Sequence, residues 1–254
     1  MKKIILLLLC ICFSISNSSA QSNRFGFEKF TGKDGTALNY RLLSPDYNTT
    51  RKFPLIVFLH GSGERGSDNE AQLKWGVLNF ATDEALSLHP AFVIAPQCPK
   101  EEQWANYYQN DSTGVFLMKS TPSKSMNLLV DLIHQFVRTH AVDRNRIYIT
   151  GLSMGGYGTY DAIERYPNLF AAAVPVCGAG DSSKAESIAH IPIWIFHGAE
   201  DPAVNCLYSL DMLNALVKAG AHPGFTQYPE VGHFSWLEAY SDKQMMTWLF
   251  RQHQ

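Results

Sequence analysis

The segment Ile147–Gly156 constrains the fold more than any other part of the chain. It reads Ile-Tyr-Ile-Thr-Gly-Leu-Ser-Met-Gly-Gly, an apolar and β-branched run that passes directly into the pattern Gly-x-Ser-x-Gly. The run predicts a buried strand, and residues 154–166, which end before Pro167, predict a short helix. Ser153 therefore lies at the tip of a sharp turn between a strand and a helix. Gly151 and Gly155 lack the side chains that would collide with neighbouring elements at so tight a turn.

Buried strands and helical segments alternate along most of the chain. The expected strands cover residues 25–31, 36–43, 53–60, 91–95, 146–150, 171–177, 192–197 and 224–228. The expected helices cover residues 70–81, 125–140, 154–166, 205–219 and 236–251. Strands that are apolar on both faces and separated by helices indicate an α/β fold. We expect a mostly parallel central sheet of about eight strands with helices on both faces. Residues 97–124 show no periodicity and are rich in aromatic and polar residues, which favours a functional surface loop.

The N-terminus reads as a targeting segment rather than as part of the fold. Two lysines precede an apolar run over residues 4–15, and Ser18-Ser19-Ala20 offers small residues before Gln21. This pattern predicts a signal peptide over residues 1–20 and a single domain over residues 21–254. A membrane anchor is the alternative, but the run is shorter than the roughly 20 residues that a span needs. We therefore expect a secreted or periplasmic protein with no stable membrane span after cleavage.

The charge of the chain argues against nucleic acid as a partner. The formal net charge is −2 and the basic residues form no stripe, so the chain lacks the electrostatic footprint of a nucleic-acid-binding protein.

Removal of residues 1–20 would leave Cys98, Cys177 and Cys206. A bridge between Cys177 and Cys206 is one alternative, and three buried thiols acting as small apolar residues are the other.

Ser153 is the candidate nucleophile because its turn has the form of a nucleophile elbow. A serine needs a base within hydrogen-bond reach, and that base needs an acid to orient it. In elbow folds the order along the chain is serine, acid, histidine. Asp201, in Phe196-His-Gly-Ala-Glu-Asp-Pro202, is the candidate acid, with Glu200 and Asp181 as competitors. His233, in Gly232-His-Phe-Ser-Trp236, is the candidate base because it follows the last expected strand.

An acyl-transfer site also needs backbone N–H donors for the oxyanion that develops in the transition state. The N–H of Met154, directly after the serine, is one candidate. The other is the N–H of Ser62, in the glycine-rich segment His60–Gly66 after an expected strand. This segment has no Gly-Lys-Ser/Thr ending, which argues against a phosphate-binding loop. The histidines and cysteines show no metal-ligand spacing, so we expect neither a metal nor a cofactor.

These motifs together resemble the α/β-hydrolase superfamily. The matching segments are residues 58–66, 95–99, 151–156, 176–181, 196–202 and 232–236. More narrowly they look like secreted bacterial esterases of the dienelactone hydrolase, phospholipase/carboxylesterase and prolyl-oligopeptidase-like groups. The resemblance implies an α/β-hydrolase fold with nucleophile Ser153, acid Asp201, base His233 and oxyanion donors at Ser62 and Met154.

The resemblance implies a serine esterase that works through an acyl-enzyme intermediate. Export and the aromatic residues Trp104, Tyr107, Tyr108 and Trp236, which we expect to be exposed around the site, favour a small or carbohydrate-linked ester. For Trp236, core packing at the start of the last helix is the alternative. Feruloyl or acetyl esters of plant polysaccharide are the preferred substrates. The alternatives are a prolyl-oligopeptidase-type peptidase acting on small peptides and a non-catalytic binding protein on a hydrolase scaffold.

Overall fold

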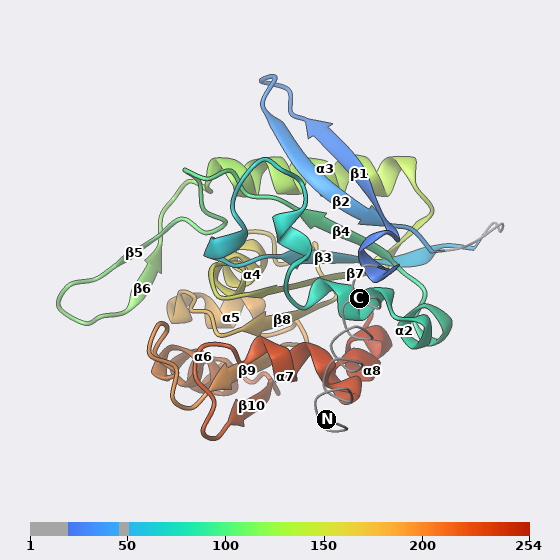
Figure 1. The fold of residues 1–254 in the computed structure, drawn as a ribbon. Helices are drawn as coiled ribbons and strands as arrows, with labels where there is room; N and C mark the ends of the chain where they lie inside the picture. Colours follow the sequence, from blue (N-terminus) through green and yellow to red (C-terminus); the bar gives the residue numbers. More distant parts are fainter. Residues whose placement is uncertain (1–19, 46–50) are drawn as a thin grey trace, which may run out of the picture.

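An eight-stranded β-sheet runs through the middle of the molecule (Figure 1). The computed structural model describes residues 20–45 and 51–254, so the predicted signal peptide lies almost entirely outside the described residues. In spatial order the strands are β1 (Phe25–Thr31), β2 (Ala37–Leu43), β4 (Phe92–Pro96), β3 (Phe53–Leu59), β7 (Val142–Leu152), β8 (Ala172–Val176), β9 (Trp194–Gly198) and β10 (Gly224–Tyr228). β2 pairs antiparallel with both β1 and β4, and the remaining pairs are parallel. The expected mostly parallel sheet is confirmed.

The sheet is buried on both faces, which explains why its strands read as continuous apolar runs. In β3 every residue is buried. Leu55, Val57 and Leu59 belong to one hydrophobic cluster, whereas Ile56 and Phe58 belong to the other. This division follows from the alternation of side chains along a strand. Each face therefore needs its own layer of helices.

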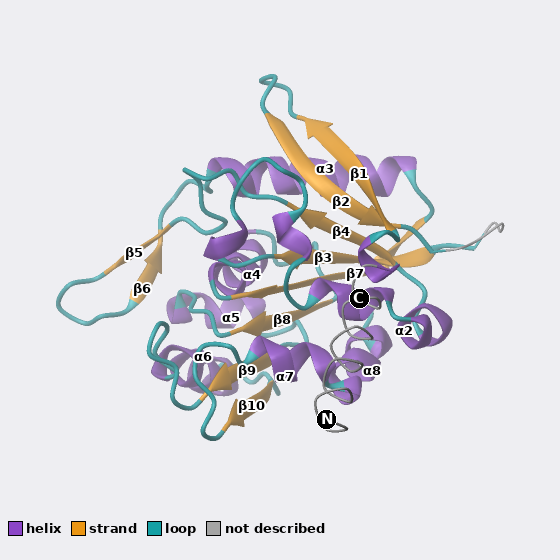
Figure 2. Cartoon of the chain, in the orientation of Figure 1, coloured by secondary structure: helices purple, strands orange, loops and turns teal. Residues whose placement is uncertain are grey.

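Within residues 20–45 and 51–254, one group of helices covers the first face of the sheet and another group covers the second (Figure 2). The first layer contains α3 (Lys124–Thr139), α4 (Met154–Arg165), α5 (Ala185–Ile188) and α6 (Leu207–Lys218). The second contains α2 (Asp83–Leu88), α7 (Trp236–Ser241) and α8 (Lys243–Arg251). In α3 the buried residues Met126, Leu129, Ile133 and Phe136 recur at helical spacing. None of the helices among the described residues is long and apolar enough to cross a bilayer.

Two of the expected helices are wrong in their extent. Residues 70–81 form two short 3₁₀ turns, Ala71–Leu73 and Val77–Ala81, instead of one helix. Gly76 separates them with φ at +73°, and the Tyr240 ring lies where a Cβ would project. The expected helix over 236–251 divides at Asp242, which is extended and whose carboxylate caps α8 at the Gln244 N–H. In both places a local backbone turn interrupts a continuous apolar pattern.

Residues 97–124 contain a small hairpin that the sequence pattern did not reveal. Its strands are β5 (Tyr107–Gln109) and β6 (Phe116–Met118). The hairpin projects from the body of the molecule near α4 (Figure 1). Its base is fastened to α4, because the Tyr107 hydroxyl donates to Glu164 at 2.8 Å and the Asn106 N–H donates to Asp161 at 3.0 Å. The hairpin therefore has a fixed position relative to the helix that begins after Ser153.

Candidate active site

Ser153 occupies a strained turn between β7 and α4. Its φ and ψ are 53° and −118°, a conformation that costs free energy for a residue with a side chain. Its N–H donates to the Val176 carbonyl at 3.0 Å, which fixes the turn against β8. A Cβ on Gly155 would collide with the Leu59 carbonyl, and one on Gly151 would collide with the Gly155 carbonyl. The two glycines therefore let α4 begin directly against β3.

The three candidate catalytic residues come together at the carboxyl end of the sheet. Ser153 Oγ lies 2.9 Å from His233 Nε2. His233 Nδ1 lies 2.7 Å from Asp201 Oδ2. Because a carboxylate accepts, Nδ1–H donates to Asp201 and Nε2 is free to accept the serine proton. The three residues follow strands β7, β9 and β10 of the one sheet, in which β8 lies between β7 and β9. The sheet thereby brings together residues that are far apart in the sequence.

The Asp201 carboxylate is completely buried, and both of its oxygens accept hydrogen bonds from the protein. Oδ1 accepts the N–H groups of Ala203 and Val204, each at 2.9 Å. Burial acts to raise the pKa of Asp201, but the hydrogen bonds from His233 and these two N–H groups outweigh it and hold the pKa below its ordinary value. Asp201 is therefore ionised at neutral pH, as an orienting acid must be.

The competing acids are engaged elsewhere. Asp181 accepts the Met118 N–H at 2.9 Å with one oxygen and the Ser183 N–H and hydroxyl with the other. Glu200 is exposed to solvent. The geometry therefore selects Asp201 as the partner of His233.

A second histidine, His197, also contacts the acid. Its Nε2 lies 2.9 Å from the Val204 carbonyl and 3.3 Å from Asp201 Oδ2, and its Nδ1 lies 2.7 Å from Ser209 Oγ. From the sequence, His197 is only the last residue of an expected strand. A polar residue at the end of the apolar run Trp194–Phe196, close before an acid, was the available signal.

The predicted oxyanion donors lie at the starts of two short helical segments. Met154 is the first residue of α4, and Ser62 is the first residue of a 3₁₀ turn over Ser62–Glu64. First-turn N–H groups have no acceptor within their own helix and are free for a ligand. Gly61 packs against Leu152, since a Cβ on Gly61 would lie 2.9 Å from Leu152 Cδ1. The glycine-rich loop thus adjoins the residue before Ser153.

The expectation that Trp104 is an exposed aromatic is wrong. Its side chain is completely buried, and its Nε1–H donates to the His60 carbonyl at 3.2 Å. Gly158 on α4 makes room for it, because a Cβ there would overlap Trp104. His60 is also buried, with Nε2 accepting the Cys98 N–H at 2.9 Å. Trp104 and His60 therefore pack beneath the glycine-rich segment His60–Gly66 and are not exposed for contact with a substrate.

The other three aromatic candidates differ in their surroundings. Tyr108 is exposed, whereas Tyr107 is half-buried and hydrogen bonded to Glu164. Trp236 is almost completely buried, so the core-packing alternative holds for this residue and not the exposed one. Its ring nevertheless packs edge-on against His233, with ring centroids 5.1 Å apart.

Cys98, Cys177 and Cys206 are free and buried, so the Cys177–Cys206 bridge is not formed. Cys177, Asp201 and His233 are a group of three possible metal ligands whose donor atoms lie within 4.8 Å of one another. The chemistry of this group does not suit a metal, because His233 and Asp201 already bind each other. Burial raises the pKa of Cys177 to about 12, which keeps it a neutral thiol.

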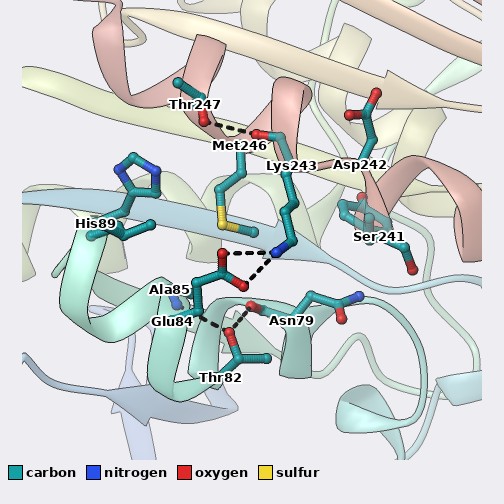
Figure 3. A pocket seen from close by; sticks show the side chains of 12 residues that line it. Asn79, Thr82, Glu84, Ala85, His89, Ser241, Asp242, Lys243, Met246 and Thr247 are labelled. Atoms are coloured by element: carbon teal, nitrogen blue, oxygen red, sulfur yellow. Dashed lines mark hydrogen bonds and ion pairs between the residues drawn. The ribbon is translucent and has the colours of Figure 1, made fainter.

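A surface pocket of about 280 Å³ lies apart from these residues (Figure 3). It is bounded by α2 on one side and by the end of α7 and the start of α8 on the other. An ion pair between Lys243 Nζ and Glu84, at 2.8 Å, spans it. The pocket contains none of the predicted site residues.

The model of the phospholipase/carboxylesterase family matches residues 47–247. The chain belongs to this family. The family lies within the α/β-hydrolase superfamily, and the predicted fold and resemblance are confirmed. Membership places the domain in a family of phospholipases and carboxylesterases.

Several individual proteins are similar to this chain. The bifunctional acetylxylan esterase/xylanase XynS20E of Neocallimastix patriciarum is 24% identical over 173 residues, which cover 68% of this chain and 23% of that protein. A probable carboxylesterase of Oryza sativa subsp. japonica is 26% identical over 191 residues, covering 70% of this chain and 80% of that protein.

Two solved structures are similar in fold to about nine tenths of this chain. A thermostable esterase is 38% identical with a TM-score of 0.86, covering 92% of this chain and 64% of that chain. A ferulic acid esterase is 16% identical with a TM-score of 0.68, covering 89% and 98%. At this identity the second likeness concerns the fold alone. The chain thus spans less than a quarter of XynS20E and somewhat under two thirds of the thermostable esterase.

Proposed function

We propose that the chain is a serine esterase that cleaves carboxylic esters through an acyl-enzyme intermediate. The observation that carries the proposal is the continuous hydrogen-bonded series from Ser153 Oγ through His233 to Asp201. A serine hydroxyl becomes a nucleophile when a base accepts its proton as it attacks. His233 Nε2 is in position to do this without any change of side-chain conformation.

In the proposed reaction Ser153 Oγ attacks the ester carbonyl while His233 takes its proton. The oxyanion accepts hydrogen bonds from the N–H groups of Met154 and Ser62. His233 then protonates the leaving alcohol, and the acyl group stays on Ser153. In the second half His233 activates water, which releases the acid and restores the serine. Asp201 holds the imidazole in the required tautomer and stabilises its charged form.

We further propose that the substrate is a carbohydrate-linked ester and that the protein is exported. Two observations support the substrate class: the similarity to XynS20E, whose name includes acetylxylan esterase, and the aromatic pair Trp236 and Phe234, of which Trp236 packs against His233. Export is proposed from the N-terminal pattern of charged, apolar and small residues. The test of export is the N-terminal sequence of the mature protein, which should begin at Gln21. A mature protein that retains Met1 would refute it.

Labelling with a fluorophosphonate tests the catalytic role of Ser153. We expect one covalent adduct on Ser153 in the folded protein and none in Ser153→Ala, whose circular dichroism spectrum should match the wild type. A folded wild-type protein that takes up no label would exclude a serine hydrolase and would favour a binding protein.

Substrate preference requires a second measurement. We expect p-nitrophenyl acetate or methyl ferulate to be cleaved with a higher kcat/KM than p-nitrophenyl palmitate or a prolyl-peptide anilide. Faster cleavage of the anilide than of all the esters would indicate a peptidase instead.

A further inference from the structure

Three aromatic rings form a connected group beside His233, and one of them, Trp236, contacts the His233 ring. Trp236 packs against His233, Phe234 packs against Trp236 with centroids 4.8 Å apart, and Trp75 lies 6.0 Å from Phe234 and 6.3 Å from Trp236. We call Trp75, Phe234 and Trp236 the His233 aromatic cluster. Its members come from the segment before Gly76 and from the segment that leads into α7, which are remote in sequence. The cluster is therefore assembled only in the folded protein.

The members of the cluster differ in exposure in a way that suits a binding surface. Trp236 is 5% exposed and forms the floor, whereas Phe234 is 55% exposed and Trp75 is partly exposed. A phenylalanine that leaves more than half of its surface in water contributes little hydrophobic free energy to the stability of the fold. Exposed apolar surface next to a reactive group is typical of a ligand site.

Charged groups border Trp75. Burial raises the pKa of Glu64, in the glycine-rich loop that carries Ser62, and the neighbouring Lys74 ammonium and Trp75 indole act to lower it. The ammonium of Lys74 lies 4.9 Å from the Trp75 ring centroid. The cluster is thus bordered by the Lys74 ammonium at Trp75 and joined to His233 through Trp236. A surface held in this way is preorganised for a ligand.

The position beside His233 decides which part of an ester would contact the cluster. The leaving oxygen of the alcohol receives its proton from His233 Nε2, so the alcohol must lie next to this ring when the bond breaks. The acyl carbon is bound instead to Ser153, and its oxygen faces the N–H groups of Ser62 and Met154. The cluster therefore adjoins the path of the alcohol.

We propose that the His233 aromatic cluster is the leaving-group subsite and binds a sugar ring. The inference rests on the proposed esterase function. A sugar has an apolar C–H face, which packs on Phe234 and Trp75, and hydroxyl groups at its edge, which hydrogen bond to Lys74. An apolar platform bordered by an ammonium fits both features. The enzyme is then specific for esters in which a sugar hydroxyl is the alcohol.

Three acetyl esters that differ only in the alcohol test this proposal. The substrates are methyl acetate, a mono-O-acetyl methyl xylopyranoside and phenyl acetate, measured with wild type, Phe234→Ala and Phe234→Tyr. Because all three form the same acetyl-enzyme, a difference in kcat/KM reports the alcohol alone. We expect Phe234→Ala to lower kcat/KM for the xyloside about fivefold to tenfold, in line with the worth of one aromatic contact. The value for methyl acetate should change less than about twofold, and Phe234→Tyr should retain activity on the xyloside because the ring is kept.

The control variant is Phe27→Ala. Phe27 is 61% exposed, comparable to Phe234, but lies on the edge strand β1, four strands from β7. It should leave all three kcat/KM values unchanged.

Equal losses of Phe234→Ala on methyl acetate and on the xyloside would overturn the inference, and so would an unchanged value for the xyloside. A loss on phenyl acetate alone would assign the cluster to aromatic alcohols rather than to sugars. A wild-type protein that hydrolyses none of the three esters would instead refute the proposed function itself.

Discussion

His197 Nε2 lies 3.3 Å from Oδ2 of Asp201, the same oxygen that accepts a hydrogen bond from His233. The His197 side chain is completely buried, and burial lowers its pKa, so it is neutral. Its Nε2–H is shared between Asp201 and the Val204 carbonyl, while Nδ1 accepts from Ser209 on α6. The acid loop is thereby tied to both β9 and α6. His197 is a positioning residue, which acts on the serine only through Asp201 and His233.

Replacing His197 by leucine should therefore impair the chemical step more than substrate binding. We expect kcat to fall about 10²-fold, as for other small misplacements of a catalytic group, with KM nearly unchanged. The lost donor leaves more of the carboxylate charge for His233, so the acid limb of the kcat/KM profile should move to higher pH. His197→Gln, which keeps a donor, should recover part of kcat. An unchanged pH profile together with a general loss of stability would reduce His197 to a structural residue.

Replacing Gly155 by a residue with a side chain should disrupt the turn at Ser153 and destabilise the protein. A Cβ there would overlap the Leu59 carbonyl, and neither α4 nor β3 can move away without breaking the sheet. We expect Gly155→Ala to lower the free energy of unfolding by more than about 3 kcal/mol, measured by urea denaturation. Gly63→Ala is the matched control, because a Cβ there meets nothing within 4 Å. It should change the stability by less than about 0.5 kcal/mol. Equal stabilities of the two variants would contradict the tight approach of α4.

His60 should make the protein less stable in mild acid. Burial lowers the pKa of His60 from 6.5 to about 4, so the folded state resists a proton that the unfolded chain accepts. Its contribution is fully present above pH 6.5 and is lost as the pH falls toward 4, by up to about 3 kcal/mol. The urea midpoint of the wild type should fall over this interval more steeply than that of His60→Gln, whose side chain can still accept from Cys98. Parallel curves would show that other groups cause the acid sensitivity.

Glu164 should have the opposite effect at higher pH. Burial raises its pKa well above the ordinary 4.5, so the folded state holds a proton that the unfolded chain loses. The stabilisation is complete below pH 4.5 and declines as the pH rises toward the folded-state pKa. Glu164→Gln imitates the neutral acid and keeps partners for Tyr107 and the Asp181 N–H. Between pH 5 and 8 the urea midpoint of the wild type should therefore fall relative to that of the variant. A wild type that gains stability over this range would show that the carboxyl group is ionised.

Local patterns predicted most of the elements correctly because they reflect burial on both faces. The runs at 53–60 and 224–228 appear as β3 and β10, and the periodic segment 125–140 appears as α3. The pattern failed where one backbone turn interrupts an apolar run, as at Gly76 and Asp242. It also failed for Trp104, since an aromatic residue in an aperiodic segment can lie on the surface or, as here, fill the space left by Gly158.

The sequence by itself determined the elbow around Ser153, the order of serine, acid and histidine, and the α/β class. These depend on residue type and on short-range periodicity, which are visible along the chain. Tertiary structure alone decided that Asp201 and not Asp181 meets His233, that His197 shares its carboxylate, and that Trp75 joins Phe234 and Trp236. Each of these contacts joins loops from different strands, and their distances depend on strand order and on packing between layers.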